Sequence, residues 1–453
     1  MTSMEREEPA ILHVVHCVDT EGPLDESLNA TFGRLEQIYG LKISPTEENL
    51  TSLQNQTFPG IDGATLKSIA QTFAPDLLAF NRNWSDVNDM NQRIFSDDLR
   101  SRKLDDFGQP WKISWFCMDH VGLHQNPRNK VLGFGQIHSY YQAHISNHTS
   151  FGDELQFHFH PKSISNNDLA AATNYTSNLP EFMESLARRL LDFTWFPTCY
   201  RPGFHSIRPD SNLLLEQWFP FDYSNQFHEE LDSQPDLASG RFGDWRRSPS
   251  TWRGYNPSLT DHQVPGNLRR TTFRCLNLGT RTRLLGKNHV EQALSEASRH
   301  GQAILAFTDH DFRDIEPDVL KIQTWLAELK VSFPKVKVRY STSTEAARSI
   351  KGLDTRPPRM EIHVSGTSLN VDVDRSDMFS IQPFLAIETK TGEVLHDNFD
   401  SGGPPGKFVY VFDELTIPLS SVSKIGVAIT GNNGVSSSVT IKDSELASFM
   451  GEK

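Results

Sequence analysis

The sequence predicts an α/β domain followed by a small antiparallel β-sandwich. Up to about residue 350, apolar segments of strand length alternate with segments of helical periodicity, a pattern typical of a parallel sheet covered by helices. Several of these strands end in polar residues. After Thr355–Arg359, whose composition is that of a linker, short alternating runs replace this pattern. We therefore expect two domains, residues 1–354 and 355–453.

Composition narrows the classes of partner. The formal net charge is −13 and no block of basic residues offsets it, which argues against nucleic acid or an anionic membrane as the main partner. No signal segment stands at the N-terminus, and no apolar run approaches the ~18 residues that span a bilayer. We expect a soluble, cytoplasmic protein without membrane insertion, whose four separated cysteines are reduced.

The first strand covers about Ile11–Val18 and is apolar enough to be buried. It runs into Asp19–Pro23, whose residues are typical of a strand exit. Asp19 and Glu21 are two residues apart, so they share a face if the extended backbone continues. The alternative is that both carboxylates solvate a loop.

Residues 24–110 follow this strand and are polar and irregular, apart from a helical period around Leu66–Phe80. A segment of this length between two strands predicts an insertion that forms a lid or the wall of a subsite. The second strand follows at about Trp111–Cys117.

The segment Gly152–Pro161 carries the clearest chemical signal. Apolar and polar side chains alternate along it, so His158 and His160 point to the same side of a strand. Pro161 ends the strand and leaves both imidazoles at the strand end, where α/β folds carry their chemistry. Two imidazoles with a carboxylate suit a divalent metal such as zinc, although a polar strand face of hydrogen-bonded histidines gives the same pattern.

The remaining elements continue the alternation. The periodicity predicts helices at about 135–144, 179–193, 213–218, 288–300 and 317–329, a helix that starts at Ser343, and strands at 302–308 and 336–340. Polar residues stand at 201, 222 and 309–311. Because parallel strands end at one rim, we expect these residues to gather into one active site with the acids and histidines above.

Residues 228–275 show no clear period but contain Trp245, Tyr255 and many arginines. Loops of this composition suit sugar rings and anionic groups, so Trp245 and Tyr255 are candidate substrate-binding residues. Ordinary loop packing is the alternative.

The second domain shows alternating runs separated by turn residues. The runs lie at 360–364, 369–373, 384–389, 408–412, 423–430 and 437–441. They predict an antiparallel β-sandwich, which either binds carbohydrate or packs against the first domain.

Five short motifs, in order along the chain, resemble those of the polysaccharide deacetylase superfamily (NodB homology, carbohydrate esterase family 4), in particular a divergent branch from surface-polysaccharide biosynthesis clusters. They are Asp19–Pro23, Phe157–Pro161, Tyr200–Gly203, Phe221–Ser224 and Thr308–Asp311. The resemblance covers about residues 10–350 and implies a deformed (β/α) barrel of the NodB type. The family's paired acids are adjacent and its paired histidines stand four apart, whereas both pairs are two apart here. This spacing keeps each pair on one face but leaves open which acid binds metal.

The resemblance implies a metal-dependent deacetylase that hydrolyses an N-acetyl amide on a sugar or glycan precursor in polysaccharide biosynthesis. Glu21, His158 and His160 would hold a divalent metal, with zinc as the expected ion. Asp19 would be the catalytic base, and it would bind the metal instead if the roles of the two acids are exchanged.

Three further residues take roles from the same resemblance. Arg201 would pair with the catalytic aspartate and keep it ionised. His310 would protonate the departing amine. Asp222 or Asp309 would orient His310 or Arg201, with Asp222 preferred on its motif.

Two other functions remain as alternatives to a deacetylase. Other metal-dependent hydrolases, of the amidohydrolase type, also use a His-x-His pair, but they carry it on the first strand, whereas here it follows an acidic first strand. A non-catalytic carbohydrate-binding scaffold is the second alternative. A bound metal favours an enzyme, and an empty site together with sugar binding by the sandwich favours the scaffold.

Overall fold

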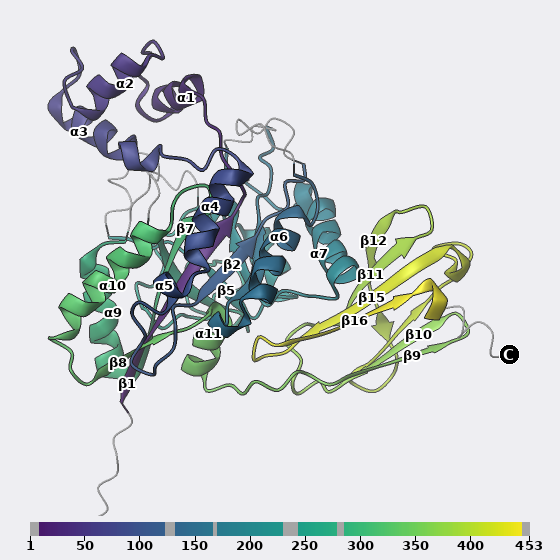
Figure 1. The fold of residues 1–453 in the computed structure, drawn as a ribbon. Helices are drawn as coiled ribbons and strands as arrows, with labels where there is room; N and C mark the ends of the chain where they lie inside the picture. Colours follow the sequence, from purple (N-terminus) through teal and green to yellow (C-terminus); the bar gives the residue numbers. More distant parts are fainter. Residues whose placement is uncertain (1–8, 123–131, 166–169, 230–242, 279–284, 446–453) are drawn as a thin grey trace, which may run out of the picture.

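The computed structural model describes residues 9–122, 132–165, 170–229, 243–278 and 285–445. Within them, seven parallel strands close into a barrel (Figure 1). In chain order they are β1 (Ala10–Thr20), β2 (Ile113–Cys117), β3 (Glu154–Phe159), β4 (Cys199–Pro202), β5 (Phe221–Asn225), β6 (Thr271–Asn277) and β7 (Gln302–His310). Each strand pairs with the next one, and β1 closes the barrel because it pairs with both β7 and β2. An eighth strand, β8 (Val336–Tyr340), pairs with the first half of β1.

Side chains of the strands alternate between the inside and the outside of the barrel. A cluster of buried residues from six of the strands, among them Val15, Phe116 and Tyr223, fills the interior. Their sequence neighbours, such as Val14 and Trp115, belong to the outer core, which also contains residues of the surrounding helices. The alternation therefore decides whether a polar residue at a strand end faces the interior or the outer layer.

Helices surround the barrel (Figure 1). They are α4 (Trp84–Ile94), α5 (Asp97–Arg100), α6 (Gln136–Asn147), α7 (Leu179–Phe193), α8 (Pro209–Glu216), α9 (Lys287–His300) and α10 (Glu316–Lys330). The predicted helices near 179–193, 288–300 and 317–329 are confirmed, and the one predicted at 213–218 begins earlier, at Pro209.

Helix α11 (Ser343–Lys351) closes the end of the barrel at which the strands begin. Ala346 and Ala347 belong to the interior cluster. Ser349 donates to Gln302 at the start of β7, and Lys351 donates to Thr271 at the start of β6. The opposite, carboxyl end of the barrel carries the predicted chemistry.

Residues 24–110 form an insertion between β1 and β2, with a helix in part of the predicted 66–80 stretch, but the expectation that the rest is irregular is wrong, because much of it is helical. Three helices, α1 (Leu28–Tyr39), α2 (Glu47–Gln54) and α3 (Gly63–Thr72), share a small core of their own. The polar residues that suggested irregularity include the N-caps of these helices, Ser27, Thr46 and Asp62, whose side chains each accept a backbone N–H. The small helical unit projects beyond the carboxyl end of the barrel (Figure 1).

The C-terminal segment forms two four-stranded antiparallel sheets that enclose a core, as the sequence predicts. Their orders are β13-β14-β10-β9 and β12-β11-β15-β16. The strands are β9 (Met360–Ser365), β10 (Ser368–Val373), β11 (Phe384–Thr389), β12 (Val394–Asp397), β13 (Asp400–Ser401), β14 (Lys407–Val411), β15 (Val422–Thr430) and β16 (Ser436–Lys442). Two strands, β12 and β13, have no counterpart among the predicted runs.

The second sheet of the sandwich packs on α7 (Figure 1). Hydroxyl groups of β16 donate to carbonyls at and beyond the C-terminal end of that helix, from Thr440 to Leu190 and from Ser438 to Thr194. The carbonyl of Leu190 also accepts the backbone N–H of Thr194, so the sandwich adds hydrogen bonds at the C-terminal end of α7 as well as packing on it.

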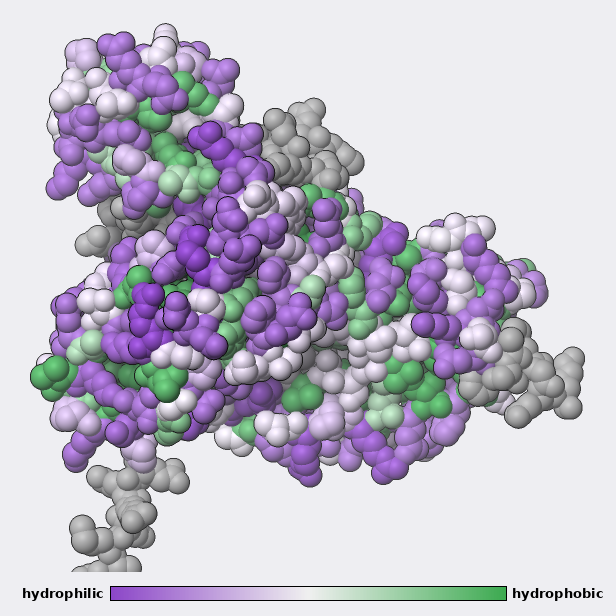
Figure 2. All heavy atoms as spheres, viewed as in Figure 1, coloured by the Kyte–Doolittle hydropathy of each residue, from purple (hydrophilic) through white to green (hydrophobic). Residues whose placement is uncertain are grey.

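Three observations concern the surface, the helices and the cysteines. The face shown in Figure 2 is mostly hydrophilic, and its hydrophobic residues lie in small separate patches. In the described part of the chain, no helix has the length and apolarity needed to cross a bilayer. All four cysteines are buried free thiols.

Candidate metal centre

Six of the predicted site residues meet at the carboxyl end of the barrel. Strand β1 brings Asp19 and leads to Glu21, while β3 brings His158 and leads to His160. Strand β4 brings Arg201, and β7 ends at His310. In β1, β4 and β7 these residues continue the alternation of the interior cluster, and in β3 the histidines alternate with residues of the outer core. All six therefore project to the interior side of the barrel wall.

Asp19 and Arg201 form a buried bidentate ion pair. The guanidinium donates from Nε to Oδ1 at 2.7 Å and from Nη2 to Oδ2 at 2.9 Å. Arg201 also donates to the carbonyl of Tyr223, which fixes the guanidinium to β5. Burial alone would raise the pKa of the Asp19 carboxyl, but Arg201 and the neighbouring His158 hold that pKa well below its usual range. Asp19 therefore stays ionised.

Glu21, His158 and His160 form a compact group of possible metal ligands, each offering one atom within 4.8 Å of the others. Oε1 of Glu21 lies 3.6 Å from Nε2 of His158 and 3.1 Å from Nε2 of His160. Asp19 lies outside this group, because both of its oxygens bond to Arg201. Its Oδ1 is 3.7 Å from Nδ1 of His158.

The hydrogen bonding of His158 fits a metal ligand. Its Nδ1 lies 2.9 Å from the carbonyl oxygen of Arg201, which can only accept, so Nδ1 carries the proton. In the neutral ring Nε2 then has a lone pair, and this buried atom has no hydrogen-bond partner. The lone pair faces the Glu21 carboxylate. A ligating histidine typically donates its second N–H to a carbonyl in this way.

Backbone contacts hold Glu21 in place. Oδ1 of Asp311 accepts the N–H groups of Glu21 at 2.9 Å and Gly22 at 3.1 Å, and His120 donates to the carbonyl of Glu21 at 2.7 Å. Tyr141 donates to the other carboxyl oxygen of Asp311. Burial raises the pKa of Asp311 to about 7. The sequence pattern places Asp311 at a strand end but gives no sign that it anchors Glu21.

The segment after Arg201 supports His160. A Cβ on Gly203 would overlap the ring of His160, so only glycine lets the imidazole take this position. Phe204 and His205 both have positive φ, of 54° and 52°, which is uncommon for residues other than glycine. The ring of Phe204 packs 5.3 Å from that of His160.

His205 is a site residue that sequence reasoning missed. Its Nδ1 is buried and lacks a hydrogen-bond partner. Burial, with the nearby Arg201 second, lowers the pKa of His205 well below its usual value. The ring therefore stays neutral. A left-handed turn after Arg-Pro-Gly is not readable from the sequence, so only the structure brings His205 here.

His310 lies beside both carboxylates. Its Nε2 is 3.9 Å from Oδ2 of Asp19 and 3.7 Å from Oε1 of Glu21. The side chains of His310 and His160 are 16% and 12% exposed, whereas those of Asp19, Glu21 and His158 are at most 4% exposed. The group is therefore open to solvent on the side of His310 and His160.

The two aspartates predicted to orient His310 or Arg201 face the outer layer instead. Asp222 stands between two interior residues of β5, so its side chain points outward, where it pairs with Arg270 at 3.3 Å. Burial raises the pKa of Asp222. Asp309 also points outward and lies 3.0 Å from Nε2 of His16. Neither aspartate reaches the residue that it was predicted to orient.

The candidate substrate-binding aromatics are buried. Trp245 has no exposed surface, and its ring N–H donates to the carbonyl of His205. Tyr255 is 8% exposed and donates to the carbonyl of His262. In this conformation neither ring offers a face to a sugar, so their arrangement is that of loop packing.

A second group of possible ligands, His228, Glu229 and His289, is less suited to a metal. Nδ1 of His289 accepts the backbone N–H of Gly286 at 2.9 Å, so in the neutral ring Nε2 carries the proton. That proton points to Glu229 at 3.4 Å. The pair is thus satisfied by a hydrogen bond, as His160 and Glu21 are at 3.1 Å. What distinguishes the first group is Nε2 of His158, which is buried without a hydrogen-bond partner.

Comparison of the chain with protein-family models, curated proteins and solved structures finds no match.

Proposed function

We propose that this protein is a metal-dependent deacetylase with a barrel of the NodB type, which hydrolyses the N-acetyl amide of a sugar or glycan precursor. The observation that carries the proposal is the convergence of Glu21 with His158 and His160, beside an aspartate held by a buried arginine. The barrel and the resemblance of the five motifs support this choice over other hydrolases.

The chemistry of the donor set fits a divalent metal, with zinc as the expected ion. One carboxylate and two imidazoles form a ligand set typical of catalytic zinc. In the neutral ring, the lone pair on Nε2 of His158 is buried and faces a carboxylate, so a metal cation bound between the two would offset their repulsion. When bound, such an ion lowers the pKa of water and polarises the amide carbonyl.

Asp19 would accept the proton of the attacking water. Its bidentate bond to Arg201 fixes the direction of the carboxylate and keeps it ionised. Because Arg201 holds its pKa so low, Asp19 binds a proton only weakly. The proton would therefore pass on to a stronger base, the nitrogen of the departing amine.

His310 would relay that proton, giving its own Nε2 proton to the amine nitrogen and regaining the one held by Asp19. Its Nε2 lies within 4 Å of both Asp19 and Glu21, on the open side of the group. An amine leaves only as a protonated species, so a donor on the side of the leaving group is required. The neutral ring of His205, close to the same charges, would line the substrate side without adding charge.

The test is turnover of defined substrates. The purified protein, supplied with zinc, is offered N-acetylglucosamine oligomers, an N-acetylated nucleotide sugar and an O-acetylated sugar, and released acetate is measured. Acetate from an N-acetylated substrate, lost in Asp19→Asn, supports the proposal. Release from the O-acetylated sugar alone, or from none of the three with metal bound, contradicts it.

A cytoplasmic location and a role in polysaccharide biosynthesis remain predictions. The four free thiols agree with a reducing compartment. Fractionation of cells that express the tagged protein tests the location directly.

A further inference from the structure

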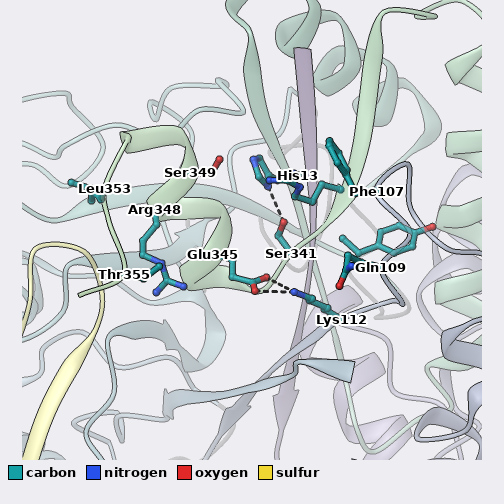
Figure 3. Close-up of a pocket in the computed structure, with 12 residues that line it drawn as sticks. His13, Phe107, Gln109, Lys112, Ser341, Glu345, Arg348, Ser349, Leu353 and Thr355 are labelled. Carbon is teal, nitrogen blue, oxygen red and sulfur yellow. Dashed lines mark hydrogen bonds and ion pairs between the residues drawn. The ribbon is translucent and has the colours of Figure 1, made fainter. Parts of the chain in front are cut away.

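A cavity of about 480 Å³ lies at the other end of the barrel from the metal centre. It is bordered by His13 near the start of β1, Lys112 just before β2, and residues of α11 (Figure 3). His13 and Asp19 are six residues apart on one strand, which corresponds to about 20 Å. The cavity is therefore separate from the metal centre, and its volume is within the usual range for small-molecule sites.

Positively charged residues outnumber negatively charged ones in the lining of this cavity. Lys112 is paired with Glu345, whose two oxygens lie 2.8 and 2.9 Å from Nζ (Figure 3). Arg339 and Arg348 also line the cavity. Within the described residues, neither has a carboxylate at ion-pair distance, although the chain as a whole has a net charge of −13.

The acidic and titratable residues that line the cavity do not neutralise this excess of positive charge. Glu345 is already shared with the backbone N–H of Thr342, which it caps at 3.0 Å. His13 is buried, which lowers its pKa to about 4, so it adds no charge at neutral pH. Its ring bonds to Ser341 at 2.8 Å and lies 3.3 Å from Gln302. Among the lining residues the two guanidinium groups therefore have no carboxylate partner. A further acid close by, Asp105, is bonded to the backbone N–H of Tyr340 at 2.9 Å.

The other lining residues supply an apolar surface and neutral polar groups. The guanidinium of Arg339 stacks on Phe107, at 3.9 Å from the ring centroid. Arg348 projects from α11 on the side of Thr355, and Gln109 lies on the opposite side of the cavity (Figure 3). Guanidinium groups present planar N–H pairs that match the two oxygens of a phosphate or carboxylate.

We propose that this cavity binds a small organic anion, whose phosphate or carboxylate is held by Arg339 and Arg348 and whose ring or alkyl part lies near Phe107. The site is independent of the metal centre, so its failure would leave the proposed deacetylase unaffected. The cavity would be a second ligand site on the barrel domain, at the end that α11 closes.

The test is calorimetric titration of the full chain at constant ionic strength with inorganic phosphate, phenyl phosphate and benzoate. We expect saturable binding of phenyl phosphate or benzoate, and the tighter of the two identifies the anionic group of the natural ligand. Arg348→Gln and Arg339→Gln should each weaken this binding about tenfold or more. If Arg348→Gln does not fold, as judged by circular dichroism, Arg339→Gln carries the same prediction from a different element.

The matched control is Arg356→Gln. Arg356 is on the nearby linker but outside the cavity, and its side chain is 83% exposed and paired with Asp354. The Arg356→Gln variant should bind the three probes with the affinities of the wild type. The proposal is overturned if no probe binds saturably to the wild type, if the folded cavity variants bind as well as the wild type, or if Arg356→Gln weakens binding equally.

Discussion

Nε2 of His158 lies 3.6 Å from Oε1 of Glu21, while the Nδ1–H of the same ring is bonded to the carbonyl of Arg201. A lone pair and a carboxylate oxygen therefore face each other in a buried position. Two acceptors in this arrangement repel each other unless a cation lies between them. The unpartnered Nε2 distinguishes His158 from the satisfied histidines of a polar strand face, and the predictions below on metal binding depend on it.

Asp19→Asn should keep the bound metal and lose turnover. The amide retains the shape of the carboxylate but cannot take a proton from water, so we expect kcat/KM to fall by about 10²- to 10⁴-fold. Metal content by mass spectrometry and acetate release on one preparation measure both quantities. Loss of metal in this variant would instead make Asp19 a ligand.

Asp222→Asn is the matched control for that variant. Asp222 is also a buried carboxylate paired with an arginine, but it faces the outer layer of the barrel. Both substitutions leave a buried guanidinium with a weaker partner, so both should destabilise the protein, by about 3 kcal/mol or more. Only Asp19→Asn should lower turnover per folded molecule. An equal loss of turnover in Asp222→Asn would contradict the role of Asp19 as the catalytic base.

Gly203→Ala should displace His160 and weaken metal binding. The new methyl group would overlap the imidazole, so the ring must leave its position beside Glu21. We expect the metal affinity to fall about 10- to 100-fold, measured by competition with a chelator. Gly33→Ala, on α1 with no neighbouring atom within 4 Å of its Cβ position, is the control and should leave affinity unchanged.

The sequence was informative where chemistry depends on local geometry. The period-two spacing of His158 and His160 put both rings on one face, and the strand ends correctly indicated where Glu21 would meet them. The sequence could not show which face Asp222 takes, because the pattern does not tell which side of β5 faces the interior, and its partner Arg270 stands nearly fifty residues later. The roles of Gly203 and His205 depend on the left-handed backbone of Phe204 and His205, which no residue pattern in the sequence predicts.

The free energy of unfolding should depend on pH through Asp309. His16 accepts the ring N–H of Trp111 at its Nδ1, so it donates from Nε2 to Asp309 as a neutral ring. Burial raises the pKa of Asp309 to about 6. Its folded pKa then exceeds its unfolded pKa, so between about pH 4 and 6 the folded state binds more protons.

The Asp309 carboxyl should therefore lower the free energy of unfolding by up to about 3 kcal/mol as the pH rises from about 4 to 6. Above that range its effect should be constant. Asp309→Asn keeps the bond to His16 but does not titrate. The difference in unfolding free energy between wild type and variant, measured in urea at several pH values, should change over this window. A difference that is flat with pH would show that Asp309 has an ordinary pKa.

The most direct test of the central claim is the zinc stoichiometry of His158→Gln beside the wild type, with His289→Gln as a control from the second group. After exposure to excess zinc and gel filtration, the wild type and His289→Gln should each retain about one equivalent of metal. Folded His158→Gln should retain less than about a tenth of that amount. Full retention in His158→Gln, or loss of the metal in His289→Gln alone, would contradict a metal centre at Glu21, His158 and His160.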